Sequence, residues 1–140
     1  MTDTHTHSVE RSIELTKRAE TIIPGVSQLI SRRPRRAASG VSPAFAERAK
    51  GCRIWDVDGN DYVDWTSAVG PIILGYADDV VDEAVKEQIS RGSIYSILHE
   101  SEVELAEELI KIIPSAEMVR FAKGGGESCT VAVRIARGVT

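Results

Sequence analysis

Residues 118–138 read MVRFAKGGGESCTVAVRIARG, an apolar stretch that runs into three glycines and then into a helical pattern. The pattern predicts a strand over 118–121 and a helix after Gly124, Gly125 and Gly126. Glycine lets the backbone approach an anion closely, and the unpaired N–H groups and dipole of a helix N-terminus favour negative charge. The stretch therefore predicts a cradle for a phosphate group.

The spacing of the glycines narrows the kind of phosphate ligand. The dinucleotide fingerprint G-x-G-x-x-G is not met, and no strand–helix–strand unit precedes the glycines. No Gly-Lys-Ser or Gly-Lys-Thr follows them, so the segment is not a Walker loop. A monophosphate group on a cofactor fits so short a turn better than a nucleotide does. On spacing alone, a plain connection between strand and helix is an equal alternative.

The composition is that of a soluble globular protein without a basic field. Of the 140 residues 42% are hydrophobic and 5% aromatic, and the net charge is −4, which argues against a nucleic-acid partner. No apolar run approaches the roughly 18–20 residues that span a bilayer, and the N-terminus lacks the pattern of a signal peptide. Cys52 and Cys129 belong to no C-x-x-C motif. We therefore expect buried or free thiols and a cytoplasmic protein without a membrane partner.

Apolar periodicity predicts the remaining elements of an α/β or α+β protein. A helix is expected over 8–23, ended by Pro24-Gly25, and a hairpin is expected around Asp58-Gly59-Asn60, because such turns need positive φ. Two more helices are expected, from Asp78 or Asp79 to Arg91 and from about Ser101 to Ile113, with His99 as a capping or exposed residue before the second.

Three polar clusters are candidate sites with simpler explanations. The arginines in Arg32-Arg33-Pro34-Arg35-Arg36 are typical of a solvated loop, although they also suit a nucleic-acid patch or the acidic group of a substrate. His5 and His7 have no partner ligands at useful spacing, so no metal site is expected. The aspartates around the hairpin lack the spacing of a calcium loop, and turn formation explains them better: Asp56, Asp58, Asp61 and Asp64.

The run from Glu47 to Asp64, ERAKGCRIWDVDGNDYVD, resembles the early hairpin of class III aminotransferases. Flanking pieces agree in the same order: IPGVSQ at 23–28, GPIILGY at 70–76, EMVRF at 117–121 and AVRIAR at 132–137. From about residue 12 to 140 the chain most resembles the glutamate-1-semialdehyde 2,1-aminomutase branch and its aminotransferase relatives.

The resemblance implies the N-terminal portion of a fold type I enzyme that uses pyridoxal 5′-phosphate (PLP). It implies a homodimer with an α/β fold, in which residues 1–65 form the helix, arm and β-hairpin of the small domain and 66–140 begin the large cofactor domain. The Schiff-base lysine of the family is expected beyond residue 140. No catalytic residue is therefore expected within the chain, which alone should be inactive.

The resemblance also assigns binding residues. In the family a Ser-Gly-Thr-Glu-Ala type sequence binds the cofactor phosphate, and here Gly124, Gly125 and Gly126 occupy its first three positions. Glycine thus replaces both hydroxyl residues, and Lys123 could supply charge instead. The resemblance further implies that substrate is contacted by three residues: Ser27, Gln28 and Val69.

The implied activity is amino transfer between an amino compound and a carbonyl acceptor. Relatives often have an aromatic residue at the position of Val69, so valine would open the pocket. An intramolecular transfer of the glutamate-1-semialdehyde type is one alternative. A non-catalytic truncated remnant or interaction module is another.

Overall fold

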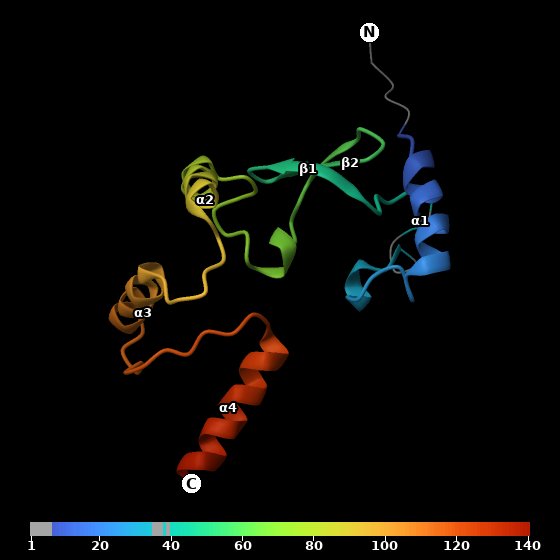
Figure 1. Ribbon diagram of the computed structural model, residues 1–140. Coiled ribbons are helices and arrows are strands. Elements are labelled where there is room, and N and C mark those ends of the chain that lie inside the picture. The colour runs from blue at the N-terminus through green and yellow to red at the C-terminus, as the bar shows by residue number, and fades with distance from the viewer. Residues whose placement is uncertain (1–6, 35–37, 39) are drawn as a thin grey trace. The chain divides into compact units, whose positions relative to one another are not determined.

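The computed structural model describes residues 7–34, 38 and 40–140 (Figure 1). The chain divides into two compact units, residues 1–91 and 92–140. The elements in chain order are α1 (Glu10–Ile22), η1 (Ile30–Arg32), β1 (Ala46–Lys50), β2 (Arg53–Asp56), β3 (Asp61–Val63), η3 (Ser67–Val69), α2 (Asp79–Arg91), α3 (Glu100–Ile112) and α4 (Gly125–Val139).

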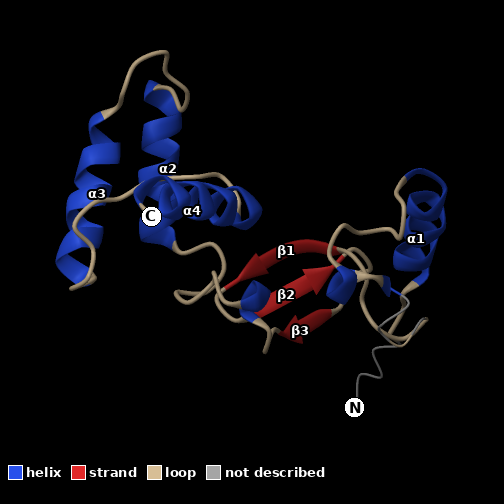
Figure 2. Cartoon of the chain, turned by 90° about the horizontal axis from the view of Figure 1, so that it is seen from below, coloured by secondary structure: helices blue, strands red, loops and turns tan. Residues whose placement is uncertain are grey.

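The sheet of the first unit has three antiparallel strands in the order β1-β2-β3 (Figure 2). β2 and β3 form the hairpin predicted around residues 58–60, with Ile54 opposite Tyr62. β1 joins β2 through the tight turn at Gly51-Cys52 and adds the third strand. The predicted hairpin is therefore confirmed, and the sheet extends beyond it.

Asp56 is the side chain around which the hairpin turn is built. It is 0% exposed and accepts hydrogen bonds from the backbone N–H groups of Asp58 (3.0 Å) and Asn60 (2.8 Å). It also accepts from Nδ2 of Asn60 (2.9 Å) and from the hydroxyl of Tyr62 (3.0 Å). Burial alone would raise the pKa of the Asp56 carboxyl, but these hydrogen bonds outweigh it and lower that pKa below 3.8. The turn-forming role predicted for Asp56 is confirmed.

The N-terminus of α1 is capped by the hairpin turn. Val9 occupies the N-cap position and makes no side-chain cap. Instead, the carboxylate of Asp58 accepts hydrogen bonds from the N–H groups of Arg11 (2.7 Å) and Ser12 (3.0 Å). A carboxylate at this position satisfies otherwise unpaired donors and interacts favourably with the helix dipole. The predicted helix therefore forms, and the hairpin holds its first turn.

Tyr62 is predicted to titrate at unusually high pH. Burial, and the hydrogen bond donated to Asp56, raise the pKa of the Tyr62 hydroxyl from 10.0 to about 12. Because the folded pKa is the higher one, this contribution to stability is complete below pH 10 and is lost as the pH rises through about 12. Ultraviolet titration of the phenolates should contain a step near pH 12 that Tyr62→Phe removes. Persistence of that step in Tyr62→Phe would contradict the assignment.

Gly75 lies where the backbone after η3 meets the sheet. Its φ is +92°, and a Cβ there would lie 3.0 Å from the Cα of Gly51. Gly59 in the hairpin has a similar φ of +87° but no atom within 4 Å of an added Cβ. We expect Gly75→Ala to lower the melting temperature more than Gly59→Ala, because the latter carries only the conformational cost of about 1–2 kcal/mol. Equal losses would mean that the backbone contact is unimportant.

The second unit contains α3 and α4. The ring of His99 accepts a hydrogen bond from the N–H of Ser101 at 3.3 Å, so the capping role expected for His99 is confirmed. α4 begins at Gly125, with Gly124 as its N-cap. The strand predicted over 118–121 is wrong for this chain. The described residues of the unit contain no strand with which residues 118–121 could pair, and a strand requires a hydrogen-bonded partner.

The described residues form little buried core. Two apolar and two polar residues among them are buried: Val9, Ala19, Ser12 and Asp56. The apolar side chains of the later helices are exposed; for example, Val80 of α2 is 81% exposed and Val103 of α3 is 59% exposed. None of the helices in the described part of the chain is long and apolar enough to cross a membrane.

Candidate functional site

The predicted phosphate cradle is the N-terminus of α4. Gly124 is the N-cap, with extended backbone and no side-chain cap, and Gly125 and Gly126 lie in the first turn. The first N–H groups of a helix have no carbonyl one turn earlier to which they can donate. A Cβ added to any of the three glycines would meet no further atom of the described residues within 4 Å. The helix start is therefore open to an anion.

The side chain of Glu127, which follows the three glycines, forms a hydrogen bond with the residue that precedes them. Its Oε2 accepts a hydrogen bond from the backbone N–H of Lys123 at 3.0 Å. Because this carboxylate accepts a hydrogen bond from a residue that precedes the helix, the N–H groups of Gly125 and Gly126 stay available to a ligand. The side chain of Lys123 is exposed, and its role as a source of positive charge stays a prediction.

Ser27 and Gln28 lie in the irregular chain between α1 and η1. The half-buried Ser27 accepts a hydrogen bond at Oγ from the N–H of Leu29 at 3.2 Å. Gln28 is exposed. Val26 has a φ of 65°, a left-handed conformation that is rare for a β-branched residue. The segment therefore has a defined, strained turn with Gln28 accessible.

Val69 lies at the end of another strained turn and is 69% exposed. The φ angles of Ser67, Ala68 and Val69 are 47°, 50° and 69°. L-residues rarely adopt such angles, and β-branched ones least of all. Two hydrogen bonds close the turn, from Val69 N–H to the Thr66 carbonyl (2.8 Å) and from Gly70 N–H to the Ser67 carbonyl (2.9 Å). The turn thus presents Val69 outward.

Arg32 acts electrostatically on the loop that carries this turn. The hydrogen bond from the Tyr76 hydroxyl to the carboxylate of Asp64, 2.7 Å long, raises the pKa of Tyr76. The positive charge of Arg32 acts in the opposite direction on this pKa. Arg35 and Arg36 of the predicted cluster lie outside the described residues.

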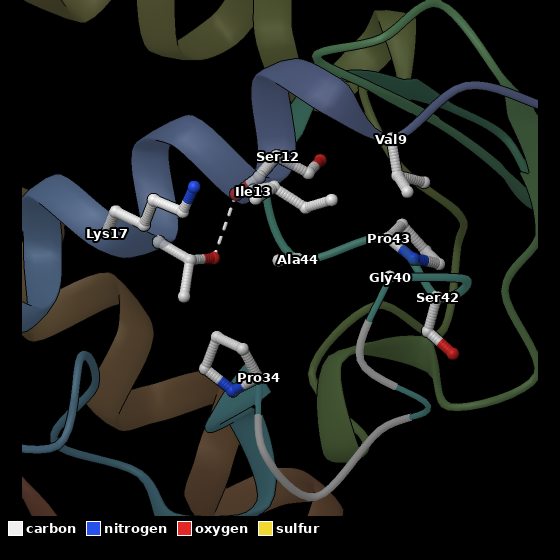
Figure 3. A pocket seen from close by; sticks show the side chains of 10 residues that line it. Val9, Ser12, Ile13, Lys17, Pro34, Gly40, Ser42, Pro43 and Ala44 are labelled. Carbon is white, nitrogen blue, oxygen red and sulfur yellow. Dashed lines mark hydrogen bonds between the residues drawn. The ribbon is translucent and has the colours of Figure 1, made fainter.

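A cavity of about 150 Å³ lies elsewhere in the first unit, between α1 and residues 40–44 (Figure 3). Val9 and Pro43 line it, and the hydroxyl of Thr16, another lining residue, donates a hydrogen bond to the carbonyl of Ser12 at 2.8 Å. This polar group is therefore used within its own helix. None of the residues predicted to contact substrate lines the cavity.

The predicted site residues are divided between the two units. Ser27, Gln28 and Val69 belong to the first unit, and the three glycines belong to the second. In the described part of the chain no three His, Cys, Asp or Glu side chains are grouped as metal ligands would be, and His5 lies outside that part. Cys52 and Cys129 are both free, as expected, and both are exposed rather than buried.

Sequence reasoning missed the pair formed by Asp64 and Tyr76. The two residues are separated by 12 positions, and no helical or strand period pairs them. The only available signal was the crowding of aspartates around the hairpin, which indicates turns without identifying a distant tyrosine as the partner.

Comparisons with known proteins agree with the resemblance seen in the sequence. A sequence model of the family "Aminotransferase class-III" matches residues 36–140. The glutamate-1-semialdehyde 2,1-aminomutase of Methanothermobacter thermautotrophicus is 45% identical over 131 residues, covering 93% of this chain and 30% of that protein. The 3-aminobutyryl-CoA aminotransferase of Cloacimonas acidaminovorans is 41% identical over 131 residues, covering 93% of this chain and 31% of that protein.

A solved structure described as a transaminase with PLP bound has a TM-score of 0.82 and 29% identity, covering 92% of this chain and 29% of that one. The chain thus spans less than a third of the length of each of these proteins. The expected fold, the N-terminal part of a fold type I transferase, is confirmed. With the family match covering most of its length, the chain belongs to the class-III aminotransferase family.

Proposed function

We propose that the chain is the N-terminal part of a PLP-dependent enzyme that transfers an amino group between an amino compound and a carbonyl acceptor. The observation that carries the proposal is the family match over residues 36–140, which includes the open, glycine-rich start of α4. Relatives of both the aminotransferase and the aminomutase kind support it.

PLP fits the start of α4 in charge and in space. The N–H groups of Gly125 and Gly126 suit a phosphate, and no side chain fills the space above Gly124, Gly125 or Gly126. Because two of these positions lack the hydroxyls of the family motif, backbone donors and the nearby Lys123 would hold the phosphate. When bound, PLP supplies an electron sink for bond changes at the amino-bearing carbon.

The substrate would be a small amino or keto compound that contacts Ser27, Gln28 and Val69. Two of these side chains are exposed and the third is half-buried, so they are accessible to a ligand. Arg32, whose charge acts on the pKa of Tyr76, would bind a substrate carboxylate bidentately. Valine at position 69 leaves more room than an aromatic residue and favours a bulkier substrate.

In the complete protein we place residues 1–65 in the small domain and 66–140 at the start of the large cofactor domain. The exposed apolar faces of α2, α3 and α4 would then be covered by the rest of the enzyme or by the second subunit of a homodimer. The negative net charge and the free cysteines support a cytoplasmic enzyme.

Intramolecular amino transfer is the second candidate. It is supported by the relatives that carry the name glutamate-1-semialdehyde 2,1-aminomutase, such as the one at 45% identity. Val69 favours intermolecular transfer instead, because a wider pocket admits amino donors and keto acceptors of different sizes, one after the other.

The test follows the amino nitrogen in the full-length protein. PLP-loaded enzyme is given nitrogen-labelled L-glutamate, L-alanine or a primary amine together with unlabelled pyruvate or 2-oxoglutarate, and separately glutamate-1-semialdehyde alone. Label moving from the donor to the keto acid supports the aminotransferase. Rearrangement of glutamate-1-semialdehyde without such exchange supports the aminomutase. PLP-loaded protein inactive in both assays would overturn the proposal.

A further inference from the structure

The turn at Thr66–Gly70 is held in a conformation that its own residues disfavour. Ser67, Ala68 and Val69 all have positive φ, and the side chain of Val69 is 69% exposed. A backbone in such a strained conformation persists only where contacts with the surrounding structure hold it there. Because Val69 points away from the chain, contacts other than the packing of Val69 must hold the turn.

The carboxylate of Asp64 supplies these contacts. Its Oδ1 accepts a hydrogen bond from the Thr66 N–H at 2.8 Å, and its Oδ2 accepts one from the Tyr76 hydroxyl at 2.7 Å. The Tyr76 bond first, and then backbone N–H groups that include those of Thr66 and Ala68, lower the pKa of Asp64. The carboxylate is therefore ionised at neutral pH and joins the two ends of the loop 64–76.

Both ends of this loop are attached to the tight turn between β1 and β2. Tyr76 exchanges two backbone hydrogen bonds with Gly51, of 2.8 Å and 2.9 Å. The N–H of Asp64 donates to the carbonyl of Cys52 at 2.8 Å. At the next positions, Nζ of Lys50 donates to the carbonyl of Ala77 at 2.6 Å. The sheet thus fixes the base of the loop, and the Asp64–Tyr76 bond is the side-chain link across it.

We propose that Asp64 and Tyr76 are positioning residues that hold the turn at Thr66–Gly70 so that Val69 meets the substrate. This inference rests on the proposed function, in which Val69 contacts the substrate. Neither residue takes part in the chemistry. Asp64 acts through the backbone of the turn, and Tyr76 acts through Asp64.

The decisive variant is Tyr76→Phe, which removes one oxygen and leaves the aromatic ring and the backbone bridge to Gly51 in place. In the PLP-loaded full-length protein we expect KM for the best donor of the panel to rise on the order of tenfold, as for loss of a hydrogen bond to a charged group. The PLP affinity and kcat should not change, because the loss affects substrate binding alone. Amide hydrogen exchange at Val69 and Gly70 should accelerate by a similar factor. Tyr95→Phe, the same change in the second unit, should alter none of these.

A series at Asp64 separates positioning from general support of the fold. Asp64→Asn keeps one acceptor oxygen and should raise KM less than Asp64→Ala does, with PLP affinity retained in both. The smaller rise of KM in Asp64→Asn is the partial rescue that is expected of a positioning residue. An equal loss of PLP affinity and kcat in both variants would indicate general misfolding and overturn the proposal.

Val69→Ala distinguishes this inference from the function on which it rests. An unchanged KM in Val69→Ala would contradict both the substrate contact of Val69 and the positioning role of Asp64 and Tyr76. If Val69→Ala changes KM while Tyr76→Phe leaves KM and amide exchange unchanged, the positioning role is wrong and the substrate contact stands. Changes in both variants, with the Tyr95→Phe control unaffected, support the proposal.

Discussion

Asp56→Ala is expected to open the hairpin and release α1 from it. The substitution removes an acceptor that is 0% exposed and leaves four donors without it: two backbone N–H groups, the Asn60 amide and the Tyr62 hydroxyl. The Asn60 amide and the Tyr62 hydroxyl also contact Ser8 and His7, but the two backbone N–H groups lose their acceptor. At about 1–3 kcal/mol for each unpaired donor, a local loss of about 3 kcal/mol is expected. The same turn carries Asp58, and the cap of α1 should be lost with it.

Amide hydrogen exchange in the full-length protein measures this opening locally. The N–H groups of Asp56 and Asp64 donate to the carbonyls of Asn60 and Cys52, so they report strand pairing and not merely the lost side chain. A loss of about 3 kcal/mol corresponds to a more than hundredfold acceleration of exchange.

Asp61→Ala is the matched control for the same hairpin. Asp61 forms an ion pair with Arg53, and both side chains are nearly half exposed. Exposed ion pairs contribute about 0–1 kcal/mol, so exchange at the Asp56 and Asp64 amides should accelerate only a few fold. Equal acceleration in Asp56→Ala and Asp61→Ala would show that the buried carboxylate has no special role.

The sequence predicted those elements that are determined by local pattern. The helices follow from apolar periodicity and from stop signals such as Pro24-Gly25, and the hairpin follows from Asp58-Gly59-Asn60. These signals act within a few residues, so they can be read without tertiary structure.

Contacts between distant residues could not be predicted in the same way. The cap that Asp58 provides for α1 joins residues 46 and 47 positions apart. The bond between Asp64 and Tyr76 depends on where the β1–β2 turn lies in space. The expected strand at 118–121 shows the converse problem, because apolar composition predicts extended backbone but not a pairing partner.

The three glycines at the start of α4 were located by the sequence, and the structure adds a reason to test them as a ligand site. Nothing in the described residues requires glycine there, since an added Cβ meets no further atom within 4 Å and none of the three has a positive φ. A ligand that approaches the backbone closely would provide the requirement that the chain itself does not.

Gly126→Val is expected to weaken PLP binding in the full-length protein by roughly 10- to 100-fold, as for loss of hydrogen bonds to a charged group. The branched side chain would keep the phosphate away from the N–H groups of Gly125 and Gly126. Gly126→Thr should be milder, because its hydroxyl can replace a lost donor. The measurement is PLP affinity by titration of the apoenzyme, together with the melting temperature of each apoenzyme.

Gly138→Val provides the control within the same helix. Gly138 lies near the end of α4 and also has no atom within 4 Å of an added Cβ. Both valine substitutions change the helix propensity in the same direction, so an effect confined to Gly126 must come from the helix start. PLP affinities that are equal in wild type, Gly126→Val and Gly138→Val would mean that the glycines only connect α4 to the preceding chain. The proposed cofactor site would then have to lie elsewhere.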